Sequence, residues 1–208
     1  MVTTSNLTYS YNGSETLTFP DVDLTPGEHL LILGPSGIGK TTLLYLMSGL
    51  LPAVDGSIYI DGDKLNSMSR RKMDQFRGKN IGLIFQQYHF IKSLNVEENL
   101  RLRQSFPVSA VDKQRTDELI ERLGLSDHRQ QKVTSLSQGQ QQRLSIALGL
   151  IHKPKVIFAD EPTSNLDDSN CDRVISLLKE EAEISKSSLV IITHDQRIKS
   201  HFKNQVVL

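Results

Sequence analysis

A glycine-rich run that ends in a lysine and two threonines is the part of the sequence best suited to chemistry. Residues 34–41 match the pattern G-x-x-x-x-G-K-[ST], in which glycines let backbone N–H groups close around phosphate oxygens. We expect Lys40 to reach the β- and γ-phosphates of a nucleotide and the Thr41 hydroxyl to ligate Mg²⁺. The expected nucleotide contacts are Gly34, Pro35, Ser36, Gly37, Ile38, Gly39, Lys40, Thr41 and Thr42. The alternative is a turn with an incidental Lys-Thr pair, but a strand predicted before the run and a helix after it favour the nucleotide.

Two acidic residues follow an apolar run later in the chain. Val156–Ala159 predicts a buried strand, and Asp160 and Glu161 stand at its carboxyl end, where open α/β sheets bind their ligands. Asp160 is a hard oxygen donor suited to Mg²⁺. Glu161 is a candidate to orient or deprotonate an attacking water. Two acids after a strand are more often a solvated strand end, so this interpretation depends on the phosphate loop.

Length and composition exclude several other classes of protein. A chain of 208 residues suits one compact domain. With 24 basic and 24 acidic residues the formal net charge is zero, so we expect no nucleic-acid partner. Cys171 is the only cysteine, which rules out an internal disulfide and fits a reducing compartment. No apolar run approaches the roughly 20 residues that cross a membrane, and no secretory signal begins the chain. We therefore expect a cytosolic protein.

The elements that must position these residues follow from the spacing of apolar side chains. Period-two alternation and short apolar runs predict strands at Leu7–Tyr11, Leu17–Leu24, Glu28–Leu33, Lys155–Ala159 and Ser188–Thr193. Helical spacing predicts helices at Lys40–Leu50, Val96–Arg103, Val111–Leu123, Gln138–Ile151 and Asn170–Ile184. Asn12-Gly13 marks a turn between the first two strands, so the chain should begin with antiparallel β-structure.

This order of elements predicts an α/β fold with a phosphate-loop nucleotide-binding core. We expect a mostly parallel sheet, an N-terminal antiparallel β part and an inserted helical subdomain. Residues 1–208 should form one domain, with residues 1–91 and 153–208 as the core and residues 92–152 as the helical insert. Because the chain stops 14 residues after His194, we expect the closing β-hairpin to be abbreviated.

One further motif narrows the choice among phosphate-loop proteins. Leu136-Ser137-Gln138-Gly139-Gln140, continued by Gln141-Gln142-Arg143, resembles the signature of ATP-binding cassette proteins, usually LSGGQ followed by QR. Stretches that agree in content and order with the same family are Ile84-Phe85-Gln86, Asp160-Glu161-Pro162-Thr163, Ser164-Asn165-Leu166-Asp167 and Ile192-Thr193-His194-Asp195. The resemblance spans essentially the whole chain and implies an ATPase whose cofactors are ATP and Mg²⁺.

The resemblance also implies that the site is shared between two copies of the chain. In the family, the helix start at Ser137, Gly139 and Gln140 faces the γ-phosphate held by the other copy, and Asp167 lies across the same interface. Ser137 and Gln140 also have capping-box spacing, and the two interpretations agree because a capped helix start with exposed N–H groups binds anions. Gln138 replaces the common glycine, but a residue in helical conformation needs no glycine.

Three more roles come from the resemblance alone. His194 is expected to contact the γ-phosphate, and Gln86 is expected to lie near Mg²⁺ and to link the site to the helical subdomain. Tyr11 matches the aromatic residue that stacks on adenine. Packing of Tyr11 in the core beside Tyr9 is a serious rival, because both share one strand face.

The partner is also inferred from the resemblance. The stretch 78–90 and the stretch 96–100 look like the bacterial subfamily that serves lipoprotein release, macrolide export and cell division. This implies a separate membrane permease and a peripheral position on the cytoplasmic face of the inner or plasma membrane. The alternative is a soluble cassette acting on ribosomes or DNA, but tandem cassettes, a long coiled-coil insertion and basic arms are lacking. A GTPase switch would need an Asn-Lys-x-Asp segment, which we do not find.

Overall fold

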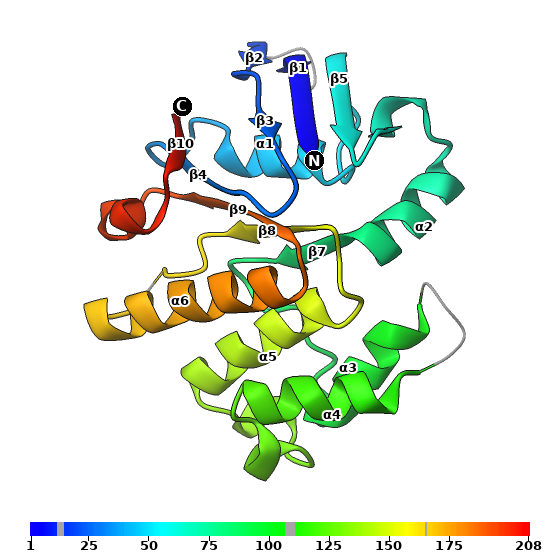
Figure 1. Ribbon diagram of the computed structural model, residues 1–208, viewed down its shortest axis with the longest axis vertical. Coiled ribbons are helices and arrows are strands. Elements are labelled where there is room, and N and C mark those ends of the chain that lie inside the picture. Colours follow the sequence, from blue (N-terminus) through cyan, green and yellow to red (C-terminus); the bar gives the residue numbers. More distant parts are fainter. Residues whose placement is uncertain (12–14, 107–110, 165) are drawn as a thin grey trace.

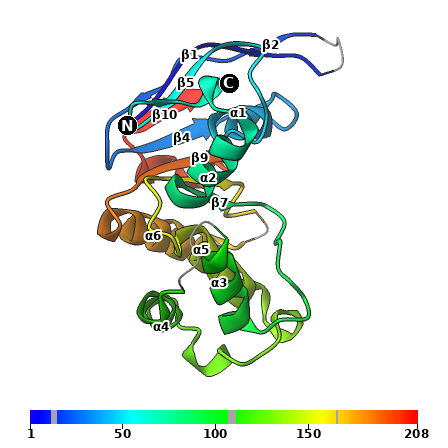
Figure 2. The same cartoon turned by 90° about the vertical axis from the view of Figure 1, so that its right-hand side faces the viewer.

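The computed structural model describes residues 1–11, 15–106, 111–164 and 166–208. Two sheets lie one above the other, and α1 (Lys40–Met47) lies between them (Figure 1). The four long helices between Val96 and Ile184 lie on the far side of the lower sheet, and the view turned by 90° shows the same separation (Figure 2). The predicted α/β class with an antiparallel part, a parallel sheet and a helical insertion is confirmed.

The upper sheet is antiparallel, in the order β2-β1-β5-β6 with β3 also paired to β1. Its strands are β1 (Val2–Tyr9), β2 (Leu17–Thr18), β3 (Asp23–Leu24), β5 (Asp55–Ile60) and β6 (Asp63–Lys64). The predicted strand Leu17–Leu24 is two short strands instead of one. Pro20 lies between them and has no N–H to donate to a neighbouring strand. The predicted turn at residues 12–13 lies outside the described residues.

The lower sheet is parallel throughout, in the order β10-β4-β9-β8-β7. Its strands are β4 (His29–Leu33), β7 (Ile81–Ile84), β8 (Val156–Asp160), β9 (Ser188–Thr193) and β10 (Asn204–Val207). The three strands predicted for this sheet agree with β4, β8 and β9 to within one residue at each end. β10 runs alone along β4, so within the described part of the chain no second strand completes a closing hairpin.

The α-helices that the described residues form after α1 are α2 (Arg70–Asn80), α3 (Val96–Ser105), α4 (Lys113–Arg122), α5 (Gln138–Leu150) and α6 (Asp168–Ile184). α3 to α6 agree with the predicted helices to within two residues. α2 was not predicted, and it has no buried side chain, so it lacks the apolar stripe by which a helix is found in a sequence. Among the described residues, no helix is long and apolar enough to span a bilayer.

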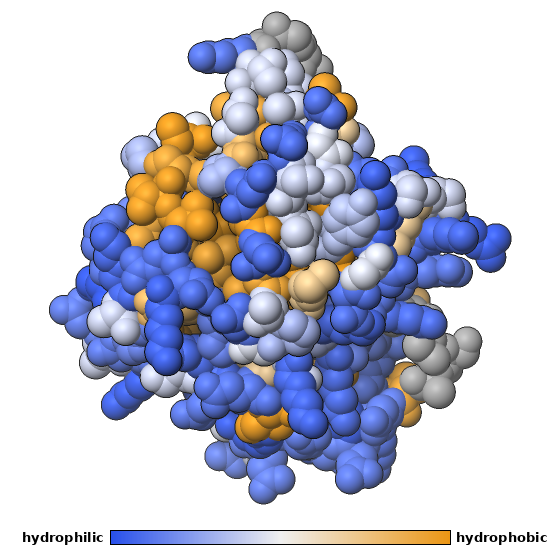
Figure 3. Space-filling model, turned by 45° about the horizontal axis from the view of Figure 1, so that its top comes forward, coloured by the Kyte–Doolittle hydropathy of each residue, from blue (hydrophilic) through white to orange (hydrophobic). Residues whose placement is uncertain are grey.

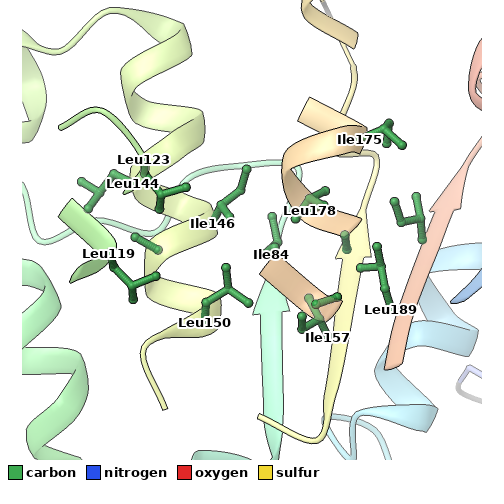
Figure 4. Packing of buried hydrophobic residues seen from close by; sticks show 14 of the residues in the cluster. Ile84, Leu119, Leu123, Leu144, Ile146, Leu150, Ile157, Ile175, Leu178 and Leu189 are labelled. Atoms are coloured by element: carbon green, nitrogen blue, oxygen red, sulfur yellow. The ribbon is translucent and has the colours of Figure 1, made fainter. Parts of the chain in front are cut away.

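Side chains alternate along the parallel strands between two hydrophobic clusters. Leu30 and Ile32 of β4 face α1 and the antiparallel sheet, whereas Leu31 and Leu33 face α5 and α6. Figure 4 shows the cluster on the α5 and α6 side, in which leucines and isoleucines of α4, α5 and α6 lie together with Ile84 of β7, Ile157 of β8 and Leu189 of β9. The sheet is therefore covered on both faces, as parallel sheets require.

The contact between β7 and α5 is close enough to exclude a side chain. A Cβ added at Gly82 of β7 would collide with the carbonyl oxygen of Gly149 in α5 and lie 3.0 Å from a ring carbon of Pro154. Glycine at position 82 thus allows the backbones of a strand and a helix to touch. This contact fixes α5, which begins at the predicted signature, against the sheet.

Candidate functional site

The predicted phosphate loop connects β4 to α1 and curls around the side chain of Lys40. Gly37 and Gly39 have φ angles of 84° and 105°, a region that residues with a Cβ rarely adopt. Lys40 is buried, and its Nζ donates hydrogen bonds to the carbonyl oxygens of Gly34 at 2.8 Å and Pro35 at 3.0 Å. Gly39 precedes the first residue of α1, and no side chain caps this helix start. The free N–H groups of such a start favour an anion.

Thr41, the residue after Lys40 in α1, contacts Asp160 of β8. The Thr41 hydroxyl donates a hydrogen bond to Oδ2 of Asp160 over 3.1 Å. Asp160 ends β8 and is buried. Burial raises the pKa of the Asp160 carboxyl, while the hydrogen bond from Thr41 acts in the opposite direction. A cation placed between these two oxygens would favour the charged carboxylate.

Glu161 has a strained backbone and a fully engaged side chain. Its φ angle is 48°, a left-handed conformation that costs a residue with a side chain about 1–3 kcal/mol. The carboxylate accepts hydrogen bonds from the Thr193 hydroxyl at 2.6 Å and from the backbone N–H of His194 at 3.1 Å. Nδ1 of His194 lies 2.9 Å from Oε1 of Glu161, and Nζ of Lys40 lies 3.7 Å from the same atom. Strain of this kind is typical of functional sites, where the surrounding contacts hold it.

Lys40, Thr41 and Glu161 line one open cavity of about 310 Å³, and Asp160 lies behind Thr41 outside the lining. Its lining consists of Ser36, Gly37, Gly39, Lys40, Thr41, Thr42, Gln86, Glu161 and His194. The phosphate loop follows β4, Gln86 follows β7, Glu161 follows β8 and His194 follows β9, so the carboxyl ends of four parallel strands converge here. The structure thus brings the predicted catalytic residues together with most of the predicted phosphate loop.

Tyr11 lies at the edge of this group. Its hydroxyl is 3.0 Å from Oγ1 of Thr42, and its ring meets the ring of Tyr9 edge-on at 4.7 Å between centroids. The Tyr11 residue is 47% exposed. An exposed ring beside the phosphate loop is compatible with stacking on a base, and the contact with Tyr9 agrees with the rival packing role.

The signature residues do not join the cavity. Ser137 caps α5, with a capping box in which the Gln140 side chain accepts from the Ser137 N–H at 2.8 Å and Ser137 Oγ accepts from Gln140 N–H at 3.4 Å. Gly139 is exposed, and a Cβ added there would have no atom within 4 Å. Gln138 is the first residue of α5 and adopts a helical conformation, as expected for a position that needs no glycine.

Asp167 also lies outside the cavity, as the exposed cap of α6. Its carboxylate accepts hydrogen bonds from the Asn170 N–H at 2.8 Å and from the Ser169 hydroxyl at 2.9 Å. Asn165, in the same motif, lies outside the described residues. Asp167 and Ser137 are therefore both exposed, and each caps a helix within the chain.

Three residues near the site were not predicted from the sequence to be site residues. Thr193 holds the Glu161 carboxylate, and Asp195 and Arg197 form a charged pair just beyond His194. The visible signal was a threonine, an aspartate and an arginine around a histidine at a strand end. No spacing rule says which partners such side chains will have.

The sequence and the fold of this chain resemble those of known proteins. A sequence profile of the family described as ABC transporter matches residues 17–164. The ATP-binding protein LolD of the lipoprotein-releasing system of Shewanella frigidimarina is 35% identical over 195 residues, covering 90% of this chain and 80% of LolD. A Mycoplasma pneumoniae protein is 37% identical over 178 residues, or 86% of this chain, and this chain spans only 62% of its length. The ATP-binding cassette MJ0796, solved as a post-hydrolysis dimer bound to ADP and Pi, gives a TM-score of 0.89 at 31% identity and covers 100% of this chain and 94% of that one.

A phosphate loop at the end of one strand of a parallel sheet, with two acids at the end of a second strand of the same sheet, defines a nucleotide-binding ATPase. The matches identify the family within this class of ATPases. The chain belongs to the ABC transporter family and is an ATP-binding protein of that family. The resemblance drawn from the sequence is confirmed.

Proposed function

We propose that two copies of this chain close around two molecules of MgATP, hydrolyse them and thereby move a separate membrane permease. The observation that carries this proposal is the unequal division of the site. Lys40, Glu161 and His194 line one cavity, whereas Ser137 and Gly139 are exposed and do not line it. A second copy related by a twofold axis would present its own Ser137 and Gly139 to that cavity. The dimeric MJ0796 cassette supports this arrangement.

The residues present fit a magnesium ion. The Thr41 hydroxyl and the Asp160 carboxylate lie in hydrogen-bond contact, and Gln86 lines the same cavity. All three offer the oxygen ligands that Mg²⁺ prefers, and nucleotide phosphates complete such sites. Among the described residues no cluster of three or more His, Cys, Asp or Glu is poised to hold a metal alone, which agrees with an ion that arrives with its nucleotide. When bound, the ion neutralises charge that develops on the phosphates.

The roles of the remaining cavity residues follow from their positions. Lys40 is already buried inside the loop and would exchange its carbonyl partners for phosphate oxygens. Glu161 would orient or deprotonate the attacking water, and His194 would contact the γ-phosphate beside it. Tyr11 would stack on the adenine. The reaction is phosphoryl transfer to water, which depends on positioning and charge neutralisation and forms no covalent enzyme intermediate.

ATP can move a partner protein only if the closed and the open dimer differ in their affinity for ATP. ATP shifts the equilibrium toward the closed dimer only to the extent that it binds that form better than the open one. In the proposed dimer that difference comes from Ser137 and Gly139, with Asp167 across the same interface. Loss of the γ-phosphate removes those contacts, so the dimer reopens.

A groove beside the cavity supports a protein partner. It has a volume of about 300 Å³ and lies where the chain leaves β7 and meets α3. Apolar and aromatic residues dominate its lining, among them Phe85, Phe90, Ile91, Leu102 and Phe106. Phe106 is 72% exposed and Ile91 is 48% exposed, as at a surface that another protein covers. The similarity to LolD supports a membrane permease as that protein, which would hold the chain at the cytoplasmic face of the membrane.

The same groove supports the proposed division of the chain. Residues 92–152 would move as one helical insert against a core formed by residues 1–91 and 153–208. Gln86 lies at the junction and lines the nucleotide cavity, so it would report the nucleotide to the insert.

Hydrolysis is tested by phosphate release from the purified chain with ATP and increasing Mg²⁺. Glu161→Gln should bind fluorescent ATP as the wild type does but lower turnover at least about a hundredfold, because only the water-activating carboxylate is lost. Unchanged turnover in this variant would remove Glu161 from the proposed role.

The partner is tested with a photo-crosslinking benzoylphenylalanine at position 106 in cells that contain the native chain. We expect adducts with an integral membrane protein. The same group at Ile184, which is exposed near the end of α6, is the control and should give no such adduct. Adducts with ribosomal proteins or nucleic acid would favour the soluble alternative.

A further inference from the structure

Two loops beside the nucleotide cavity are joined by one arginine. Arg197 lies in the short 3-10 helix η4 (Gln196–His201), three residues beyond His194. Its Nη1 donates to the carbonyl oxygen of Leu166 at 3.2 Å and to Oδ1 of Asp168 at 2.6 Å. Leu166 and Asp168 flank Asp167, so Arg197 holds the exposed segment that carries Asp167 from both sides.

The other edge of the same guanidinium is bound to Asp195. Nε of Arg197 donates to Oδ1 of Asp195 at 2.9 Å, and Nη2 donates to Oδ2 at 2.7 Å. This is a bidentate pair, the geometry in which arginine recognises carboxylates most strongly. The Asp195 side chain is 11% exposed, and hydrogen bonding from Arg197 lowers its pKa to about 2. Asp195 is therefore charged at neutral pH.

Asp195 continues the connection toward the cavity. It accepts a hydrogen bond from the Thr163 hydroxyl at 3.0 Å, and its own N–H donates to Thr193 Oγ1 at 2.9 Å. Thr193 in turn donates to the Glu161 carboxylate at 2.6 Å. An unbroken series of hydrogen bonds thus runs from the segment around Asp167, through Arg197 and Asp195, to the carboxylate that faces the nucleotide.

Arg197 itself does not line the nucleotide cavity, so it cannot act on a substrate directly. The segment that it holds is exposed and, in the proposed dimer, lies against the other copy. We propose that Arg197 is a positioning residue that couples the two nucleotide sites, by fixing the Asp167 segment to the loop of Thr193 and His194. This inference rests on the proposed dimer and adds to it the residue through which one site senses the other.

The test measures ATP turnover as a function of ATP concentration for the wild type, Arg197→Ala and Arg197→Lys. For Arg197→Ala we expect the maximal rate to fall about tenfold, because a small displacement of catalytic groups has effects of that order or larger. The Hill coefficient should fall toward about one, the value for uncoupled sites. ATP binding to the single chain should stay within about twofold, because no cavity residue changes. Arg197→Lys should not restore coupling, because a lysine lacks the fork that reaches Asp195 and the Asp167 segment together.

Arg101→Ala is the matched control. Arg101 is exposed to a similar degree, 46% against 41% for the side chain of Arg197, and it also forms an ion pair, with Glu97. It lies on α3, away from the cavity lining. We expect this variant to keep the maximal rate and the Hill coefficient of the wild type.

Asp168→Asn is the second variant. Its side chain is 87% exposed, so the substitution does not threaten folding. It should lower the Hill coefficient in the same direction as Arg197→Ala but by less, because Arg197 keeps its bond to Leu166.

The outcomes separate the inference from the proposed function. A wild type that hydrolyses ATP cooperatively, with Arg197→Ala indistinguishable from it, would overturn the inference alone. A wild type without cooperativity would overturn it as well. A wild type that neither hydrolyses ATP nor dimerises would refute the proposed function itself.

Discussion

Two helix starts in this molecule are built in opposite ways. α1 begins after Gly39, in a left-handed conformation and with no side-chain cap. α5 begins after Ser137, with both hydrogen bonds of a capping box in place. The start of α1 has an acidic pair beside it, since Asp160 reaches Thr41 and Glu161 lies near Lys40. Ser137, Gly139 and Gln140 at the start of α5 are not among the residues that line the cavity.

The difference indicates which part of the site is complete within one chain. An uncapped helix start, with a lysine folded into its loop, is stabilised by an anion that binds there. The start of α5 already has its capping hydrogen bonds, so it does not need an anion from the same chain to stabilise it. We infer that α1 holds the nucleotide and that α5 serves the nucleotide of a second chain. Figure 3, in which the top of Figure 1 comes forward, shows a mostly hydrophilic face with one larger contiguous hydrophobic area.

The largest effect should come from the start of α1. Lys40→Ala removes the cation inside the phosphate loop, and ATP affinity should fall at least about a hundredfold, since charge-assisted bonds to phosphate are lost. Titration with a fluorescent ATP analogue measures this directly. Lys113→Ala, at the exposed start of α4, should bind as the wild type does. Retained affinity in Lys40→Ala would refute the nucleotide assignment of α1.

The start of α5 should respond differently. Gly139→Asp places an acid in the first turn of α5, where its interaction with the helix dipole stabilises the helix by about 0.3–1 kcal/mol. The space around this position is open, so the new Cβ meets no other atom. The variant should therefore fold and bind ATP normally, yet lose turnover at least about tenfold, because the acid repels the phosphates of the partner's nucleotide. Phosphate release and urea unfolding measure the two quantities. Normal turnover would place α5 outside the site.

Gly82, which packs against α5, and Gly139, at the open start of α5, extend the comparison to stability. Gly82→Ala should lower the free energy of unfolding by about 2 kcal/mol or more, because the new Cβ collides with the backbone of Gly149. Gly139→Ala should raise it by about 0.5 kcal/mol, since alanine is the better helix former and nothing is near. Denaturation of both variants in urea tests the pair. Equal effects would contradict the contrast between a packed and an open glycine.

A smaller effect is expected at Asp195. Its pKa is lowered to about 2 from an ordinary 3.8, so its charged contacts stabilise the folded chain above pH 4 and are lost as the pH falls from 3.8 toward 2. Asp195→Asn should lower the free energy of unfolding by about 1 kcal/mol at pH 6, a value reduced because Arg197 is partly exposed. The difference from the wild type should narrow at pH 3. A difference that widened on acidification would contradict the assigned charge state.

The sequence predicted those parts of the fold that carry a regular apolar pattern. β4, β8 and β9 are buried on both faces and lie at the expected positions, and α6 has a clear apolar stripe. α2 was missed because all of its residues are polar or only partly covered. The single strand expected from Leu17 to Leu24 is interrupted at Pro20, because proline has no backbone N–H to donate to a neighbouring strand.

The same limit applies to the site. Lys40, Thr41, Asp160 and Glu161 follow local patterns beside strands, so their meeting could be predicted. The bonds from Thr193 to Glu161 and from Arg197 to the Asp167 segment join residues about 30 positions apart. Such contacts depend on how loops pack, and no local spacing encodes them.

The central claim is that one chain holds only half of each catalytic site. Light scattering of Glu161→Gln, with saturating ATP and Mg²⁺, tests it most directly. The account predicts a mass twice the 23.4 kDa of one chain, and a return to the single mass when Gly139→Asp is added. A mass of one chain at every protein concentration, with ATP bound, would contradict it.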